Sequence, residues 1–145
     1  MIVGMKIQKD IYSQIMGCYD IVPPECGGII GGENEIVSTY YHDNICDIMG
    51  SAIYEPNTVQ LNKVIHNWSE IGVSFLGLLH SHPEHELSLS DNDMLYIKKL
   101  LYSLPNDTKL YFPIVIPKQT IIPFSAQIHD GKITILQEDL EICSR

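Results

Sequence analysis

The stretch that decides the fold runs from Val73 to Pro83 and is V-S-F-L-G-L-L-H-S-H-P. Its first seven residues are almost all apolar, which is typical of a strand that is buried on both faces of a sheet. Side chains alternate along a strand, so His80 and His82 leave it on the same face. Pro83 forces the chain out of the strand just after the second histidine. The sequence therefore predicts two neighbouring imidazoles at the carboxyl end of a buried strand, where open clefts form in α/β sheets.

A carboxylate, Asp93, follows eleven positions after the second histidine. Ser90 and Asp93 match the capping-box pattern S-x-x-D, as do Ser88 and Asp91, and each pair taken alone indicates only the start of a helix. Two imidazoles that end an apolar strand need polar partners, however, and the first turn of that helix can direct Asp93 back toward them. Catalytic zinc is usually held by three such N and O ligands, with a fourth position open. We therefore expect a metal site here.

The composition predicts one globular domain over residues 1–145, with 45% hydrophobic and 19% charged residues. The formal net charge is −9, from 9 basic and 18 acidic residues. This balance argues against nucleic acid or an anionic membrane as a partner, because both select for basic patches. The sequence shows no secretory signal pattern and no apolar run of the ~20 residues that span a bilayer. The four cysteines (Cys18, Cys26, Cys46 and Cys143) include no C-x-x-C pair, so we expect a cytoplasmic protein with reduced thiols.

Local patterns predict a mixed α/β order along the chain. Helices are expected over Lys9 to Tyr19, from about Pro56 to Gly72, and over about Asp91 to Leu104. Besides the buried strand, further strands are expected over residues 27–32, 35–41, 109–116, 120–128 and 132–136. Such an order is typical of a layered domain in which a sheet is packed between helices.

Several zinc enzymes use an H-x-H pair, and most of them do not fit this chain. The barrel of TIM-type amidohydrolases needs ~200–250 residues or more. The nucleic-acid deaminase signature H-x-E…P-C-x-x-C and the H-E-x-x-H motif are both absent. The chain does contain H-S-H-P, six further residues, Ser90, two residues and Asp93, with the segment Pro23-Pro24-Glu25-Cys26-Gly27-Gly28 upstream. Together these elements resemble the signature of the JAMM (MPN-plus) metalloproteases, and the resemblance covers nearly the whole chain.

This resemblance implies an α/β fold of three layers, similar to that of cytidine deaminases, with a mixed sheet packed between helices. It also implies one zinc ion per chain, bound by His80, His82 and Asp93, with water as the fourth ligand. Glu25 would be the general base that takes the proton of the water. Ser90 would donate a hydrogen bond to the oxyanion of the tetrahedral intermediate.

The activity that the resemblance implies is hydrolysis of a peptide or isopeptide bond. The compact chain resembles the stand-alone prokaryotic members, which process the C-terminal Gly-Gly tails of ubiquitin-like or sulfur-carrier proteins. Such a tail is extended and could add as a strand beside an exposed sheet edge. Two alternatives stay open: a zinc peptidase that acts on an unrelated cell-wall or phage-tail peptide, and a non-catalytic MPN scaffold. The sequence does not set the oligomeric state, and a homodimer is among the states it allows.

Overall fold

The computed structural model describes residues 4–19, 26–43, 56–83 and 85–144. Its helices are α1 (Lys9–Cys18), α3 (Thr58–Glu70) and α4 (Asp91–Tyr102). Its strands are β1 (Met5–Gln8), β2 (Gly27–Glu33), β3 (Ile36–His42), β4 (Ser74–Ser81), β5 (Lys109–Tyr111), β6 (Ile114–Ile116), β7 (Thr120–Ile122), β8 (Phe124–His129), β9 (Lys132–Gln137) and β10 (Leu140–Cys143).

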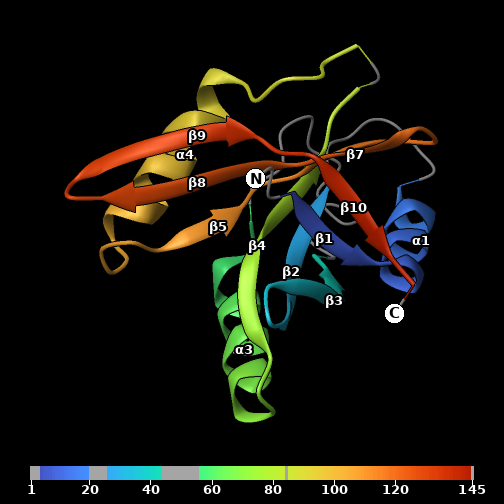
Figure 1. Ribbon diagram of the computed structural model, residues 1–145, viewed down its shortest axis with the longest axis horizontal. Coiled ribbons are helices and arrows are strands. Elements are labelled where there is room, and N and C mark those ends of the chain that lie inside the picture. Colours follow the sequence, from blue (N-terminus) through green and yellow to red (C-terminus); the bar gives the residue numbers. More distant parts are fainter. Residues whose placement is uncertain (1–3, 20–25, 44–55, 84, 145) are drawn as a thin grey trace.

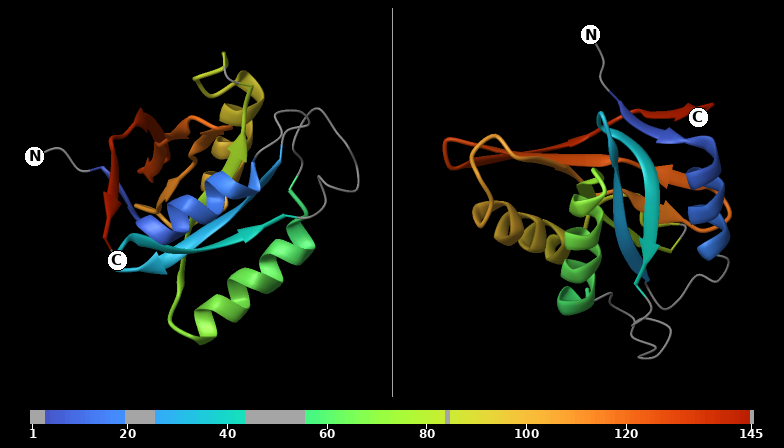
Figure 2. Two further views of the ribbon diagram at one scale, coloured as in Figure 1. Left: turned by 90° about the vertical axis from the view of Figure 1, so that its right-hand side faces the viewer. Right: turned by 90° about the horizontal axis from the view of Figure 1, so that it is seen from below.

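The strands form one mixed sheet in which β4 is central (Figure 1). The order is β10-β1-β3-β2-β4-β5-β8-β9, with β6 paired to β4 and β7 paired to β6. β4 is antiparallel to β2 and parallel to both β5 and β6. Figure 2 shows α1 on one side of the β2–β3 hairpin and α3 and α4 on the other. The expected arrangement of a mixed sheet between helices is therefore confirmed.

Two apolar cores fill the space between the sheet and its helices. The α1 core consists of Met5, Ile7, Ile11, Ile15, Tyr19, Ile30, Val37, Tyr40, Leu79, Tyr111, Val115 and Ile121. The α3–α4 core consists of Ile29, Leu61, Leu78, Leu89, Ile97, Leu101, Leu110, Phe112, Ile114, Ile116, Phe124, Ala126 and Ile128. Successive residues of a strand face opposite sides of a sheet, so Leu78 and Leu79 of β4 enter different cores. This is why the sequence of β4 is a continuous apolar run rather than an alternating one.

Close contact between α3 and β2 depends on a glycine. A Cβ atom placed on Gly31 would lie 2.6 Å from the Trp68 ring, so a larger residue at this position would push the helix away from the sheet. α3 itself begins at the N-cap Asn57, whose side chain accepts a hydrogen bond from the Gln60 N–H. The helix predicted from Pro56 thus starts two residues later, and it ends before Gly72, which has a φ of +80°.

Two of the predicted strands are each divided in the structure. Residues 109–116 form β5 and β6, separated by Phe112 and Pro113, and residues 120–128 form β7 and most of β8, separated by Pro123. Proline has no N–H to donate to a ladder. The chain over residues 109–116 pairs with β4 before and after Pro113, but its partner on the other side changes from β8 to β7. This division lets β5 and β6 follow β4 in turn, and β6 lies beside His80 and Ser81.

The sequence patterns did not predict β1 or β10. These two strands pair in parallel, with Met5 opposite Leu140, and β1 also pairs with β3. Both are only four residues long, and their pairing joins segments from the two ends of the chain. They lie next to each other on the side of the sheet near α1 (Figure 1).

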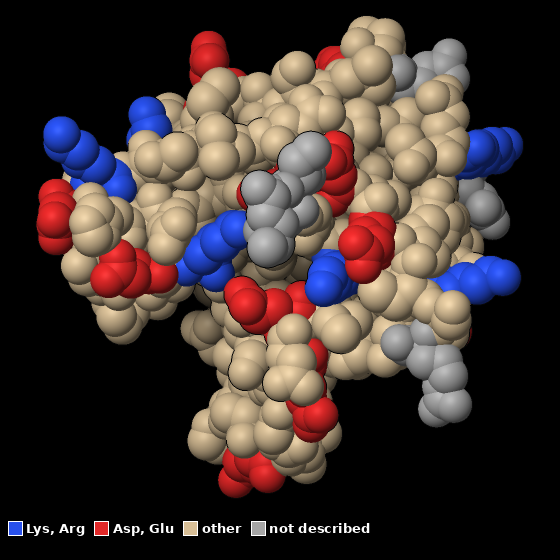
Figure 3. Space-filling model, viewed as in Figure 1, with Lys and Arg blue, Asp and Glu red and all other residues tan. Residues whose placement is uncertain are grey.

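Acidic and basic side chains are interspersed on the molecular face drawn in Figure 3. Among the described residues, Lys109 forms an ion pair with Glu138 at 3.6 Å. Glu138 also accepts a hydrogen bond from the buried Ser125 hydroxyl. On this face the described residues form no broad basic surface, in keeping with the net charge of −9.

Candidate metal centre

The two histidines lie at the end of β4, as the alternation of its side chains predicts. Leu78 belongs to the α3–α4 core, so His80 and His82 face the side of α4 while Ser81 faces α1. Backbone hydrogen bonds hold this end of the strand against β6, from His80 N–H to the Pro113 carbonyl and from His82 N–H to the Val115 carbonyl. Both imidazoles are buried, with exposed fractions of 8% for His80 and 3% for His82.

The first turn of α4 brings the carboxylate to the histidines. Ser90 is the N-cap, and its Oγ accepts from the Asp93 N–H at 3.1 Å. The Asp93 carboxylate in turn accepts from the Ser90 N–H at 2.9 Å through Oδ2, which completes a capping box. The predicted cap is therefore present, and it orients the carboxylate as well as starting the helix. The buried Leu89 anchors the preceding loop in the α3–α4 core.

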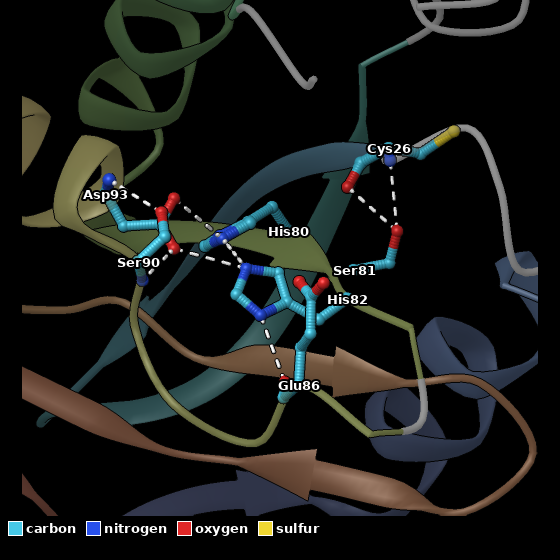
Figure 4. A network of polar contacts seen from close by, with 7 residues as sticks. All are labelled: Cys26, His80, Ser81, His82, Glu86, Ser90 and Asp93. Carbon is cyan, nitrogen blue, oxygen red and sulfur yellow. Dashed lines mark hydrogen bonds and ion pairs between the residues drawn. The ribbon is translucent and has the colours of Figure 1, made fainter. Parts of the chain in front are cut away.

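Three ligand atoms converge from these elements (Figure 4). His80 Nε2 lies 2.9 Å from His82 Nε2 and 3.1 Å from Asp93 Oδ1. His82 Nε2 lies 3.1 Å from Asp93 Oδ2. Among the described residues, these three side chains are the group of His, Cys, Asp and Glu whose ligand atoms lie close enough together to hold a metal ion.

The hydrogen bond on the far side of His82 determines which of its nitrogens carries the proton. His82 Nδ1 lies 3.1 Å from the carbonyl oxygen of Glu86, which can only accept, so Nδ1 is the protonated nitrogen of the neutral ring. Nε2 then faces both the Asp93 carboxylate at 3.1 Å and His80 Nε2 at 2.9 Å. At these distances a proton on Nε2 can join His82 to Asp93 through a hydrogen bond, and a metal ion could take the place of that proton. The Glu86 carbonyl contact was not predicted, although the turn that follows Pro83 was a signal for it.

The electrostatic environment keeps Asp93 ionised. Burial by itself raises the pKa of this carboxyl, because it disfavours the charged form. The hydrogen bonds with His80 and His82 and the charge of His80 outweigh that effect, so the pKa lies well below its usual range. An anionic carboxylate and two imidazole nitrogens are ligands that zinc accepts.

The separations of the three atoms fit a tetrahedral metal ion. Zinc binds nitrogen and oxygen at about 2.0–2.2 Å, which places the ligand atoms of a tetrahedral site roughly 3.3 Å apart. The observed separations of 2.9 to 3.1 Å are shorter by a few tenths of an ångström. Small rotations of the rings would admit the ion, and the residues present therefore fit the group that the family implies.

Other polar residues around the histidines complete the description of the site. Ser90 lies beside Asp93 at the site, as described above. Ser81 points away from the histidines and bonds to the backbone of Cys26 (Figure 4). His85 is exposed and contacts Glu86 at 3.8 Å. The predicted base, Glu25, lies outside the described residues, so its role stays a prediction.

The family model of prokaryotic homologs of the JAB domain matches residues 18–126, about three quarters of the chain. The chain belongs to this family. The match includes both histidines, Asp93 and the glutamate segment. A comparison with curated proteins gives no significant match. Within the described part of the chain, no helix has the length and the apolar character that crossing a membrane requires.

Solved structures share the fold of this JAB-domain chain at low sequence identity. A protein from Desulfitobacterium hafniense is 19% identical with a TM-score of 0.65, covering 95% of this chain and 93% of its own. A JAB1/MPN domain protein from Archaeoglobus fulgidus is 15% identical with a TM-score of 0.52, covering 94% and 99%. A protein from Salinibacter ruber is 17% identical with a TM-score of 0.56, covering 96% and 92%. These likenesses confirm the predicted MPN fold.

Proposed function

We propose that the chain is a cytoplasmic zinc metallopeptidase with one catalytic domain, which hydrolyses a peptide or isopeptide bond. The observation that carries the proposal is the arrangement of His80, His82 and Asp93. Three ligand atoms converge, and His82 Nε2 faces the Asp93 carboxylate in a chain of the JAB family.

A bound zinc ion supplies a Lewis acid that lowers the pKa of a water ligand to about 7. The chain has to supply the base, and Glu25 is our candidate. Gly27 pairs with His80, and the Ser81 N–H donates to the Cys26 carbonyl. These contacts bring Cys26, the residue that follows our candidate in the sequence, beside the segment that carries both histidines.

Ser90 is our candidate for the oxyanion donor. Its hydroxyl oxygen accepts from the Asp93 N–H, and this bond uses a lone pair but not the hydroxyl proton. The proton therefore stays available to a substrate carbonyl oxygen beside the site. Glu25 would take a proton from the attacking water and pass it to the leaving amine, while Ser90 donates to the oxyanion.

For the substrate we propose the C-terminal Gly-Gly tail of a ubiquitin-like or sulfur-carrier protein. An extended tail that lacks bulky side chains can pair with the edge of a sheet and reach a narrow site. Among the described strands, β7, β9 and β10 each have a strand on one side only. Of these, β7 lies nearest the site, because its partner β6 pairs with β4 at His80 and Ser81.

Metal analysis and a cleavage screen test the proposal. The purified protein should contain about one equivalent of zinc. Less than about half an equivalent, unrestored by added Zn²⁺, would indicate the scaffold instead. The screen offers ubiquitin dimers, a C-terminally extended sulfur-carrier protein and short cell-wall peptides. Cleavage of the peptides alone would contradict the proposed substrate and favour the unrelated peptidase. As a matched control, Glu25→Gln should keep the zinc and lose cleavage.

A further inference from the structure

The serine between the two histidines has an unexplained set of contacts. Ser81 is 1% exposed and faces α1, away from the metal site. Its Oγ accepts from the Cys26 N–H at 3.0 Å and lies 3.4 Å from the Cys26 carbonyl oxygen, to which it donates. The Ser81 N–H also donates to that carbonyl, at 2.8 Å. Both polar backbone groups of Cys26 are thus bonded to Ser81.

Strand pairing alone does not require the hydroxyl. The ladder between β2 and β4 already joins Gly27 to His80 in register, and the Ser81 N–H extends it by one bond. The two bonds of the hydroxyl come in addition, at the point where β2 begins. A side chain with both a donor and an acceptor can hold a peptide N–H and a carbonyl at once. A small apolar residue would fill the same volume without fixing either group.

We propose that Ser81 is a positioning residue, which fixes the backbone of Cys26 beside the segment of the two histidines and acts through Cys26 on the proposed general base, its neighbour in the sequence. The inference rests on the proposed function, because it assumes that Glu25 acts as the base. The N–H that Ser81 holds belongs to the peptide bond between these two residues. The Cα atoms of successive residues are held about 3.8 Å apart by covalent geometry, so a shift of the Cys26 backbone is passed on to its neighbour in the chain.

A base must lie within hydrogen-bond reach of the proton it abstracts, at about 2.6–3.2 Å. A displacement of about 1 Å, caused by a change away from the reacting atoms, can cost on the order of 100-fold in rate. His80, Ser81 and His82 are consecutive, so a single segment both carries two candidate metal ligands and holds Cys26, the residue next to the proposed base in the sequence. Ser81 acts only through Cys26 and touches neither substrate nor metal.

The first test compares Ser81→Ala and Ser81→Thr with a control, Ser125→Ala. Ser125 is a buried serine of the same sheet whose hydroxyl bonds to Glu138, away from the histidines. In the zinc-loaded protein, Ser81→Ala should lower kcat by about 10- to 100-fold with little change in KM. Ser81→Thr keeps the hydroxyl and should retain most of kcat. Equal kcat values for Ser81→Ala and Ser125→Ala would overturn the proposal.

The second test asks whether Ser81 acts through the base or through the metal ligands. Ser81→Ala loaded with Co²⁺ should show the visible spectrum and metal content of the parent protein, since the histidines keep their contacts. A changed spectrum or a parallel loss of metal would overturn the proposal.

Amide hydrogen exchange separates a failure of this inference from a failure of the proposed function. In Ser81→Ala the Cys26 amide should exchange faster by up to about tenfold, and in Ser125→Ala it should not. This measurement needs no substrate. Unchanged exchange in Ser81→Ala would show that the hydroxyl does not hold the Cys26 amide, and the inference would then be wrong. Faster exchange in a protein that cleaves nothing would instead contradict the proposed peptidase.

Discussion

Ser90 has two proposed roles, the helix cap and the oxyanion donor, and three substitutions separate them. Ser90→Ala removes both the acceptor of the Asp93 N–H and the donor to a substrate. Ser90→Gly also removes the hydroxyl, but glycine at an N-cap costs only a few tenths of a kcal/mol, against about 0.5–2 kcal/mol for alanine. Ser90→Thr keeps the cap oxygen and the hydroxyl proton.

The two roles predict different rankings of the three variants, one in stability and one in activity. Loss of the cap should lower the free energy of unfolding of Ser90→Ala by about 1 kcal/mol, which is about 2–4 °C in Tm for a chain of this size. Ser90→Gly should be closer to the parent protein. If the hydroxyl donates to the oxyanion, alanine and glycine should reduce kcat equally, by about 10²–10³. Ser90→Thr should retain most of the parent kcat.

Thermal unfolding of the zinc-loaded variants measures the ranking in stability. Steady-state cleavage of the substrate found in the screen measures the ranking in activity. Zinc content is measured in parallel, because the Ser90 N–H also bonds to a candidate ligand oxygen of Asp93. The reasoning is refuted if kcat follows Tm across the three variants, with glycine active and alanine impaired. Ser90 would then act as a cap that orients Asp93 and not as a donor to the substrate.

Three further predictions follow from the packing and the metal centre. Gly77→Ala should destabilise the fold by about 3 kcal/mol or more in urea unfolding, because the added Cβ would lie 1.8 Å from the Tyr111 carbonyl oxygen. As a control, Gly17→Ala in α1 has open space around its Cβ and should stabilise the fold by ~0.5–1 kcal/mol. Equal effects of the two substitutions would contradict the packing at Gly77. Leu101→Ala in the α3–α4 core should cost ~2–5 kcal/mol, and the exposed Tyr102→Ala less than about 0.5 kcal/mol. Chelation should lower Tm and added Zn²⁺ should restore it, because the ion binds the folded site; a Tm insensitive to both would argue against a metal centre.

The sequence predicted the elements that carry strong local signals. The apolar run before His80 gave the central strand, and the S-x-x-D pattern at Ser90 gave the start of α4. The strands between Lys109 and Ile128 were predicted without their breaks, because the effect of an internal proline depends on which neighbour the strand pairs with. β1 and β10 were missed since their pairing joins the ends of the chain, which no local pattern records.

The sequence by itself determined that two imidazoles share a face and that a carboxylate follows them in the first turn of a helix. Both results come from local periodicity, which depends only on backbone geometry. The tertiary structure decided that the three ligand atoms lie 2.9 to 3.1 Å apart and that the Glu86 carbonyl sets the proton of His82. It also decided that Ser81 holds Cys26, 55 positions away in the chain. These contacts depend on how β2, β4 and α4 pack together, because neither a distance nor a hydrogen-bond partner between distant segments follows from local sequence.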